Sequence, residues 1–259
     1  MSASPRVVLV TGSTTGIGEA CAKVFAQGGD AVMVSGTKSV AGQRVVADIR
    51  QHGGKADFVE LDLREPGAPG KLVAATVARL GRLDVLVNNA GILYPGTALD
   101  TTEHQWRDTM AVNVDALFFA SQAAVKVMLA QGKGAIVNIA SEWGLNGEPN
   151  YVAYCTSKAA VIQITRCMAL DHAHHDIRIN AVCPGEIHTR MVDEILAKKG
   201  GDSATNLRQL AAGIPMRRLA APVEVARCVR FLASDDASYV TGTTLAVDGG
   251  NDATAGPYP

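Results

Sequence analysis

The sequence has almost no net charge and few cysteines, and both shortages exclude classes of protein. Lys and Arg total 24 against 25 Asp and Glu, a formal net charge of −1, so no broad basic field is available for nucleic acid or an anionic membrane. The five cysteines are an odd number without tight spacing, which argues against a disulfide framework and favours a reducing compartment, the cytoplasm. We therefore expect a cytoplasmic protein without a nucleic-acid partner.

Long apolar runs are also missing. No stretch approaches the roughly 18 apolar residues of a membrane helix, and residues 1–6 hold no apolar signal core, so we expect no membrane association. With 47% hydrophobic and 19% charged residues, the chain has the composition of a folded globular protein. No linker-like change in composition divides its 259 residues, which predicts a single domain over 1–259 with a short tail at 251–259.

Two kinds of segment alternate along the chain. Short β-branched apolar runs predict strands at 7–10, 31–34, 85–87, 135–137 and 245–247, with weaker candidates at 58–61 and 177–182. Longer stretches predict helices at 17–27, 39–51, 112–131, 153–174 and 222–233. Continuous apolar strands are typical of parallel sheets that helices cover on both faces. The sequence therefore predicts an α/β fold, a doubly wound parallel sheet in three α/β/α layers.

A glycine-rich segment at residues 11–18 lies between the first predicted strand and the first helix. Gly12, Gly16 and Gly18 would allow a tight turn and a close approach of a ligand's phosphates to the main chain. The helix that follows offers free N–H groups and a partial positive charge at its N-terminus. A turn without a ligand is the alternative, but the placement in a βαβ unit favours a dinucleotide site.

Further motifs follow in a fixed order, and together they carry a family resemblance. They are Asn88-Asn89-Ala90-Gly91, Ser141, Tyr154 and Lys158 in a Y-x-x-x-K pattern, Pro184-Gly185 with Thr189, and Val247-Asp248-Gly249-Gly250. With the T-G-x-x-x-G-I-G segment, they make the chain resemble the short-chain dehydrogenase/reductase family over nearly its whole length. The resemblance implies a Rossmann-type fold and an NAD(P)-dependent oxidoreductase of secondary alcohols and ketones. It also implies a homotetramer or homodimer.

Tyr154 and Lys158 lie four residues apart on a predicted helix, so their side chains share one face. A nearby ammonium should lower the pKa of the phenol, and Tyr154 could then exchange a proton with the substrate oxygen while hydride passes to or from the cofactor. Ser141 is suited to hydrogen-bond the same oxygen. The resemblance implies that Lys158 also holds the nicotinamide ribose and that Asn113 anchors a water linking Lys158 to solvent. Tyr151 has no lysine one turn on and is rejected as the base.

The resemblance also implies the cofactor contacts. They are Gly12, Ser13, Thr15, Gly16, Ile17, Gly18, Thr37, Lys38, Asp62, Leu63, Asn89, Ala90, Gly91, Tyr154, Lys158, Pro184, Gly185, Ile187 and Thr189, with Asn88 beside the adenosine. Enzymes that prefer NAD usually carry an acid at the end of the second strand. Gly36 occupies that position here, with Thr37 and Lys38 after it, so the sequence favours NADP over NAD while leaving both open.

The substrate end is predicted less sharply. Its candidate residues are Leu93, Tyr94, Glu142, Trp143, Asn146, Glu148, Glu186 and His188, with a lid at about 186–215. This polar mixture suggests a hydroxylated or charged substrate. No metal site is expected, because His172, His174 and His175 lie at a helix end, where they complement the helix dipole. Cys155 and Cys183 lack a positioned base and are not expected to be nucleophiles.

Two other functions remain to be weighed. A sugar-nucleotide epimerase would space its glycines as G-x-x-G-x-x-G, which the segment at 11–18 does not. A catalytically silent dinucleotide-binding regulator of the same fold would usually have lost the Tyr or the Lys of the Y-x-x-x-K motif, and both are present.

Overall fold

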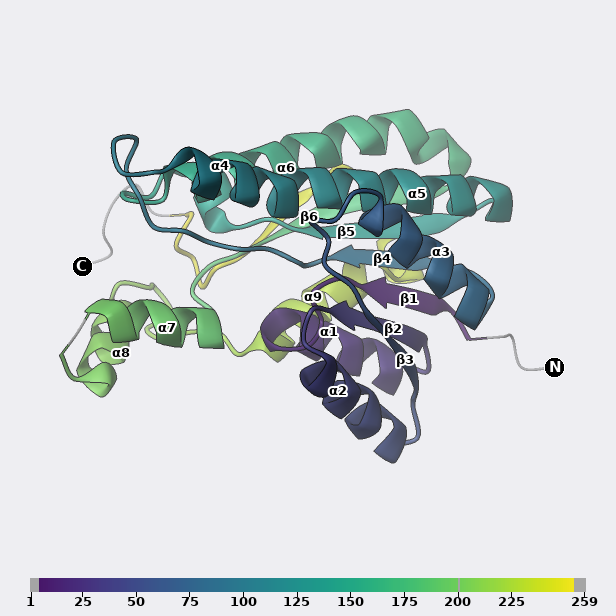
Figure 1. Ribbon diagram of the computed structural model, residues 1–259, viewed down its shortest axis with the longest axis horizontal. Coiled ribbons are helices and arrows are strands. Elements are labelled where there is room, and N and C mark those ends of the chain that lie inside the picture. Colours follow the sequence, from purple (N-terminus) through teal and green to yellow (C-terminus); the bar gives the residue numbers. More distant parts are fainter. Residues whose placement is uncertain (1–4, 200, 254–259) are drawn as a thin grey trace.

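Seven parallel strands form one sheet at the centre of the molecule (Figure 1). The computed structural model describes residues 5–199 and 201–253, so most of the tail predicted at 251–259 lies outside the described residues. The strands are β1 (Val7–Val10), β2 (Ala31–Gly36), β3 (Lys55–Glu60), β4 (Val85–Asn88), β5 (Gly134–Ile139), β6 (Ile177–Pro184) and β7 (Thr244–Val247). Their order across the sheet is β3-β2-β1-β4-β5-β6-β7, and every neighbouring pair is parallel.

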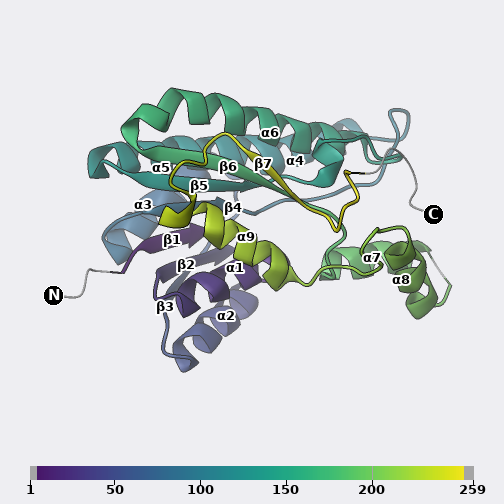
Figure 2. The same cartoon turned by 180° about the vertical axis from the view of Figure 1, so that it is seen from behind.

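Helices cover both faces of this sheet, which confirms the predicted three-layer α/β fold. One face carries α1 (Gly16–Gln27), α2 (Ser39–Gln51) and α9 (Pro222–Leu232), and the other carries α3 (Ala68–Leu80), α5 (Ala116–Gln131) and α6 (Val152–His172). Both faces of β1 are fully buried, as its β-branched sequence predicts. Figure 2 shows α9 packed beside α1 on one face and α6 on the other.

Four helices were not among the predicted elements. These are α3, α4 (Glu103–Met110), α7 (Arg190–Lys199) and α8 (Ser203–Ala212). The start of α4 did carry a local signal, because Thr102 and Gln105 form a capping box in which each side chain accepts the other's main-chain N–H. The last two helices occupy the segment predicted as a lid, and they project beyond the carboxyl end of the sheet (Figure 1).

The expectation about apolar runs needs a correction. α4 continues through a π-helical segment, Ala111–Asp115, into α5, and the whole run Glu103–Gln131 is long and apolar enough to cross a membrane by length and composition. Its most apolar window has a mean hydropathy of 1.3, and half of that window is buried within the protein. The sequence did not predict this run because polar side chains such as Asn113, Asp115 and Gln122 interrupt it, and a helix packed in the core of a protein passes the same test.

The strand order positions the site. The chain proceeds from β1 outward to β3 and then returns, so that β4 lies on the other side of β1. At such a reversal the connections leave the sheet in opposite directions and open a crevice at the carboxyl ends of the strands. The loops that follow β1 and β4 carry the glycine-rich segment and the Asn88–Gly91 motif, and both therefore reach this crevice.

Candidate active site

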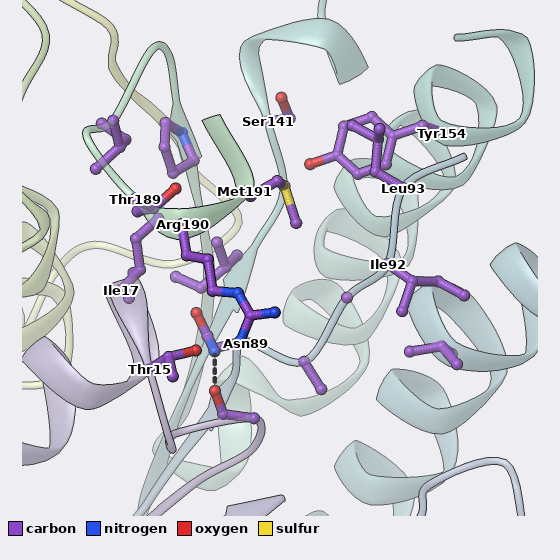
Figure 3. A pocket seen from close by; sticks show the side chains of 18 of the residues that line it. Thr15, Ile17, Asn89, Ile92, Leu93, Ser141, Tyr154, Thr189, Arg190 and Met191 are labelled. Carbon is purple, nitrogen blue, oxygen red and sulfur yellow. Dashed lines mark hydrogen bonds between the residues drawn. The ribbon is translucent and has the colours of Figure 1, made fainter. Parts of the chain in front are cut away.

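A cavity of about 440 Å³ opens at the carboxyl ends of the strands. Most of the predicted site residues line it, although they come from segments far apart in the chain. They are Gly12, Thr15, Gly16, Ile17, Thr37, Lys38, Asp62, Leu63, Asn89, Ala90, Gly91, Ser141, Tyr154, Lys158, Pro184, Gly185, Ile187 and Thr189. The volume lies within the range of small-molecule and cofactor sites. The glycine-rich loop forms one end of the cavity, and Ser141 and Tyr154 form the other (Figure 3).

The glycine-rich loop is held against the loop after β4 by hydrogen bonds between side chains and main chain. The Thr11 hydroxyl accepts the N–H groups of Asn89 and Ala90 at 2.9 and 3.0 Å. The Asn89 amide in turn donates to the carbonyls of Thr11 and Gly12, both at 3.0 Å. Gly12 has a φ of +61°, and a Cβ on it would lie 2.8 Å from the Ala90 Cα. Only glycine therefore fits where the two loops meet.

This end of the cavity suits a dinucleotide. Thr15, the N-cap residue of α1, makes no side-chain capping bond, so the N–H groups of the first turn are not used by a cap. Free N–H groups and the positive end of the helix dipole are the chemistry that binds a pyrophosphate. The residues present thus fit a nicotinamide dinucleotide.

Apart from Asn88, which is described below, three of the predicted catalytic and cofactor-binding residues do not line the cavity. The Ser13 side chain lies beneath the loop, where its hydroxyl donates to the Val10 carbonyl at 2.7 Å and accepts the Ser35 N–H at 3.0 Å. A Cβ on Gly18 would collide with the Asn89 amide and the Gly12 carbonyl, so this glycine permits packing of α1 against the loops. The third residue is Asn113.

Asn113 is a buried bridge between three segments. Its Oδ1 accepts the Ile92 N–H at 2.8 Å, and its Nδ2 donates to the Ile92 carbonyl at 2.9 Å and to the Ser157 hydroxyl at 3.0 Å. It lies in the π-helical segment, an irregularity often found at functional sites. The side chain therefore joins the loop after β4 to α6, and its predicted role in anchoring a water stays a prediction.

Asn88 is also placed differently from the expectation that it lies beside the adenosine. Its amide is buried in the core, where Nδ2 donates to the Ser121 hydroxyl and to the Asn138 Oδ1, both at 2.8 Å. Adjacent strand residues point to opposite faces of a sheet, and here the turn after β4 begins only at Asn89. The second asparagine of the motif, rather than the first, reaches the cavity.

At the other end, Tyr154 and Ser141 face each other (Figure 3). Both Tyr154 and Lys158 lie on α6, and the Lys158 Nζ is 5.5 Å from the centre of the Tyr154 ring. Lys158 is only 4% exposed, and its ammonium donates to the Ile139 carbonyl at 2.8 Å. The predicted face of the helix thus does bring the phenol and the ammonium to one cavity.

The electrostatics differ from the expectation that the lysine lowers the pKa of the tyrosine. Burial raises the pKa of Tyr154 to about 12, and the facing Ser141 hydroxyl opposes this rise only in part. Burial also lowers the pKa of Lys158 to about 8. Removal from water disfavours the charged form of both groups, and it is the largest cause of both shifts.

The comparisons with known proteins agree with this geometry. Residues 12–252 match the family model described as enoyl-(acyl carrier protein) reductase. The chain is 40% identical to cyclopentanol dehydrogenase of Comamonas sp. over 245 residues, which are 95% of this chain and 96% of that protein. It is 38% identical to meso-2,3-butanediol dehydrogenase of Serratia marcescens over 251 residues, 97% and 96% of the two chains. The chain belongs to the short-chain dehydrogenase/reductase family.

A solved structure supports the cofactor class of this short-chain dehydrogenase/reductase. A variant of actinorhodin polyketide ketoreductase with NADPH superimposes with a TM-score of 0.93 at 33% identity, covering 96% of this chain and 98% of that one. With the family membership, this makes the protein an NAD(P)-dependent oxidoreductase.

Two arginines that line the cavity were not among the predicted site residues. Arg64 holds the Asp62 carboxylate with Nε and Nη2, the shortest contact being 2.6 Å, and also reaches Asp108 at 3.5 Å. Arg190 lines the cavity from α7 and extends toward Asn89 (Figure 3), while its Nε donates to Glu194 at 2.6 Å. Neither belongs to a motif, although the position of Arg64 two residues after Asp62 was a local signal for their pairing.

Of the predicted substrate contacts, five line the cavity and three do not. Those that do are Leu93, Tyr94, Glu142, Trp143 and Glu186, whereas Asn146, Glu148 and His188 are not among the lining residues. The Asn146 Nδ2 donates to the Asp252 Oδ1 at 2.6 Å, and the His188 Nε2 lies 3.5 Å from the Asp193 Oδ1. The sequence placed all eight near the motifs, but only the loop conformations decide which side chains face inward.

Proposed function

We propose that this short-chain dehydrogenase/reductase interconverts a secondary alcohol and a ketone, with Tyr154 exchanging the proton at the substrate oxygen. The observation that carries the proposal is that the hydroxyls of Tyr154 and Ser141 face each other at one end of a cavity whose other end is the glycine-rich loop. The names of the two dehydrogenase relatives support an alcohol as substrate.

The side chains divide the work. With a pKa of about 12, the Tyr154 phenol keeps its proton at neutral pH, as required of a group that donates it to the oxygen of a ketone. Ser141 donates a hydrogen bond to the same oxygen and so orients it. Lys158, with a pKa of about 8, is mostly protonated at pH 7, and its ammonium would hold a ribose hydroxyl of the bound cofactor. A bound nicotinamide would supply or accept the hydride.

We further propose NADP rather than NAD as the preferred cofactor. β2 ends in Gly36 without the acid that binds the ribose hydroxyl, and a Cβ there would lie 2.8 Å from the Thr14 Cγ2, so a larger side chain has little room. Lys38 follows in the cavity wall, with an ammonium that can neutralise a phosphate. Arg64 lines the same region, although its guanidinium is committed to Asp62.

The test begins with a fluorescence titration of the purified protein with NADPH and with NADH. It continues with a panel of secondary alcohols and ketones, in which oxidation or reduction of the nicotinamide is followed by absorbance. Tight binding followed by turnover supports the proposal, and tighter binding of NADPH supports the role of Lys38. Binding without turnover of any member would instead favour the catalytically silent regulator. Binding of neither cofactor would overturn both functions.

We also propose a homotetramer or homodimer, a cytoplasmic location and a lid formed by α7 and α8. Exposed apolar side chains on α5, Phe118, Phe119 and Leu129, offer a surface that a second copy could cover. All five cysteines are free, which suits a reducing compartment. Light scattering tests the assembly, since a mass of 27.0 kDa in solution would show a monomer.

A further inference from the structure

We infer that the substrate of this enzyme carries a cationic ammonium group, and that Glu142 and Glu186 are the residues that select it. The inference rests on the proposed function, because it concerns the substrate end of the same cavity. Glu142 follows Ser141 directly, and Glu186 follows the Pro184-Gly185 turn at the end of β6. Both line the cavity beside Tyr154.

Glu142 is a buried carboxyl group with one side-chain partner. It is 5% exposed, and its Oε2 accepts from the Asn251 amide at 3.1 Å. Within 5–199 and 201–253, its other oxygen has no hydrogen-bond partner. The carboxyl packs closely against the Pro184-Gly185 turn, since a Cβ on Gly185 would lie 2.9 Å from its Oε2. A buried carboxyl costs free energy unless it is paired, so its place in a cavity wall calls for a partner from a ligand.

The surrounding charges do not compensate this carboxyl. Burial above all, together with repulsion from Glu186, Asp248 and Glu148, raises the pKa of Glu142 to about 7, although the hydrogen bond from Asn251 opposes the rise. Burial likewise raises the pKa of Glu186, with Glu148 adding to the effect. In the described part of the chain neither Glu142 nor Glu186 forms an ion pair. The substrate end therefore holds uncompensated negative charge whenever these groups ionise.

The cations near this end are already engaged. Arg218, which lines an adjoining hollow with Glu186, is paired with Glu224 at 2.7 Å. Arg190 is paired with Glu194, and the Lys158 ammonium is held by the Ile139 carbonyl, where we propose that it meets the cofactor ribose. In the described part of the chain no cation pairs with Glu142 or Glu186, and a ligand ammonium would supply one.

An aromatic wall lies next to the carboxylates. Trp143 stacks on Tyr151 with ring centres 4.8 Å apart and meets Tyr154 edge-on at 6.0 Å. The face of an indole ring attracts cations as well as apolar groups. Carboxylates beside an aromatic face form a subsite for an ammonium, whereas a neutral hydroxyl would leave the repulsion among the acids unrelieved.

The experiment compares secondary alcohols that differ at one position. Three trios are compared, built on a linear alcohol, a cyclopentanol and a cyclohexanol. Within each trio the three members share the skeleton and carry a methyl, a hydroxyl or an ammonium group at the same position. We expect kcat/KM for the best ammonium member to exceed that of its methyl partner by about tenfold, the effect of one favourable charge pair. The ratio should rise between pH 6 and pH 8, because Glu142, with a pKa of about 7, loses its proton there while the substrate ammonium stays charged.

Variants locate the effect. Glu142→Gln and Glu186→Gln should each reduce the ammonium-to-methyl ratio several-fold and flatten its pH dependence. Glu103→Gln, at an exposed position on α4, is the matched control and should leave the ratio unchanged. Cofactor titration checks that each variant is folded. If Glu142→Gln does not fold, Glu186→Gln still tests the inference.

The remaining outcomes are distinct. Equal kcat/KM for the methyl and ammonium members of every trio overturns the inference and leaves the proposed function intact. A preference for the hydroxyl member that grows as the pH falls also overturns it, since protonated carboxyls would then act as hydrogen-bond donors. If no member of any trio is oxidised with either cofactor, the proposed function fails instead, and the inference fails with it.

Discussion

The two ends of the cavity are built in different ways. The cofactor end consists largely of main chain. There the carbonyls of Thr11 and Gly12 accept from the Asn89 side-chain amide, and the Ala90 N–H donates to the Thr11 hydroxyl. The substrate end consists of side chains such as Leu93, Trp143 and Glu186, which come from loops after three different strands. A main-chain site depends on a few glycines at fixed spacing, whereas a side-chain site depends on how distant loops fold.

The largest expected effect is at the substrate end. Tyr154→Phe removes the hydroxyl that exchanges the proton and should lower kcat/KM about a thousandfold. Fluorescence titration should show unchanged cofactor affinity, because the other end keeps its main-chain contacts. Tyr151→Phe is the control, since Tyr151 does not line the cavity, and it should keep most of the activity. Retention of activity by Tyr154→Phe would remove the distinction between the two ends.

The next effect is on the cofactor end. Gly12→Ala forces a side chain into a left-handed backbone and against Ala90, and should lower the free energy of unfolding by roughly 2–3 kcal/mol. Gly53→Ala shares the positive φ but meets no atom within 4 Å, so it should cost only about 1 kcal/mol. Urea unfolding of both variants measures the two losses in free energy of unfolding, and their difference is the cost of the steric contact with Ala90. Equal losses would show that the close approach of the two loops is unimportant.

The third prediction concerns Lys158, whose ammonium lies between the two ends. Its pKa is about 8 in the folded protein, against the 10.5 of an ordinary lysine, so the folded state releases the proton first as the pH rises. The penalty of burying the charge is present in full below pH 8 and falls progressively between pH 8 and about 10.5. Lys158 should therefore contribute a gain of about 1–2 kcal/mol to the free energy of unfolding between pH 7.5 and pH 9.5. The thiols of Cys21 and Cys183, whose pKa values burial raises to about 12 and about 11, act in the opposite direction in the same interval, so this gain is measured against a variant.

Lys158→Met is the comparison that isolates this contribution, because both proteins keep the same cysteines. The free energy of unfolding of the wild-type protein should gain about 1–2 kcal/mol relative to that of Lys158→Met between pH 7.5 and pH 9.5. The window stops below pH 10 because the raised pKa of Tyr154 acts in the opposite direction above it. An identical change in both proteins would mean that Lys158 does not release its proton in this interval.

The smallest effect probes the adenosine side of the cofactor end. Lys38→Ala should weaken NADPH binding about fivefold, the loss of one lysine–phosphate contact, and leave NADH binding unchanged. Lys126→Ala, far along α5, is the control and should change neither. Equal weakening of both cofactors would show that Lys38 does not read the phosphate.

Local patterns in the sequence predicted the sheet and most of the cofactor end. The β-branched runs are the strands, and the glycine and Y-x-x-x-K motifs line the cavity. The patterns missed α7 and α8, whose mixed polar composition resembles a loop, and they did not predict that the Ser13 and Asn88 side chains turn away from the cavity. The Ser13 hydroxyl lies beneath the glycine-rich loop and the Asn88 amide lies in the core. A motif states which residues are present but not which way each one faces.

For Tyr154 and Lys158, the sequence predicted where the side chains lie but not their pKa values. The i,i+4 spacing of Tyr154 and Lys158 correctly placed both side chains in one cavity. It could not predict that burial would raise the pKa of the phenol and lower that of the ammonium, because desolvation depends on everything packed around the two groups.

The sequence by itself determined the alternation of strands and helices, the main-chain chemistry of the glycine-rich loop and the helix that carries the tyrosine and lysine. These depend on short-range patterns of hydrophobicity, backbone freedom and helical spacing. Only the tertiary structure brought Glu142, Glu186 and Trp143 to one wall, committed Arg64 to Asp62 and buried Lys158. Contacts between residues far apart in the chain, and the exclusion of water they cause, exist only once the sheet and its loops have assembled.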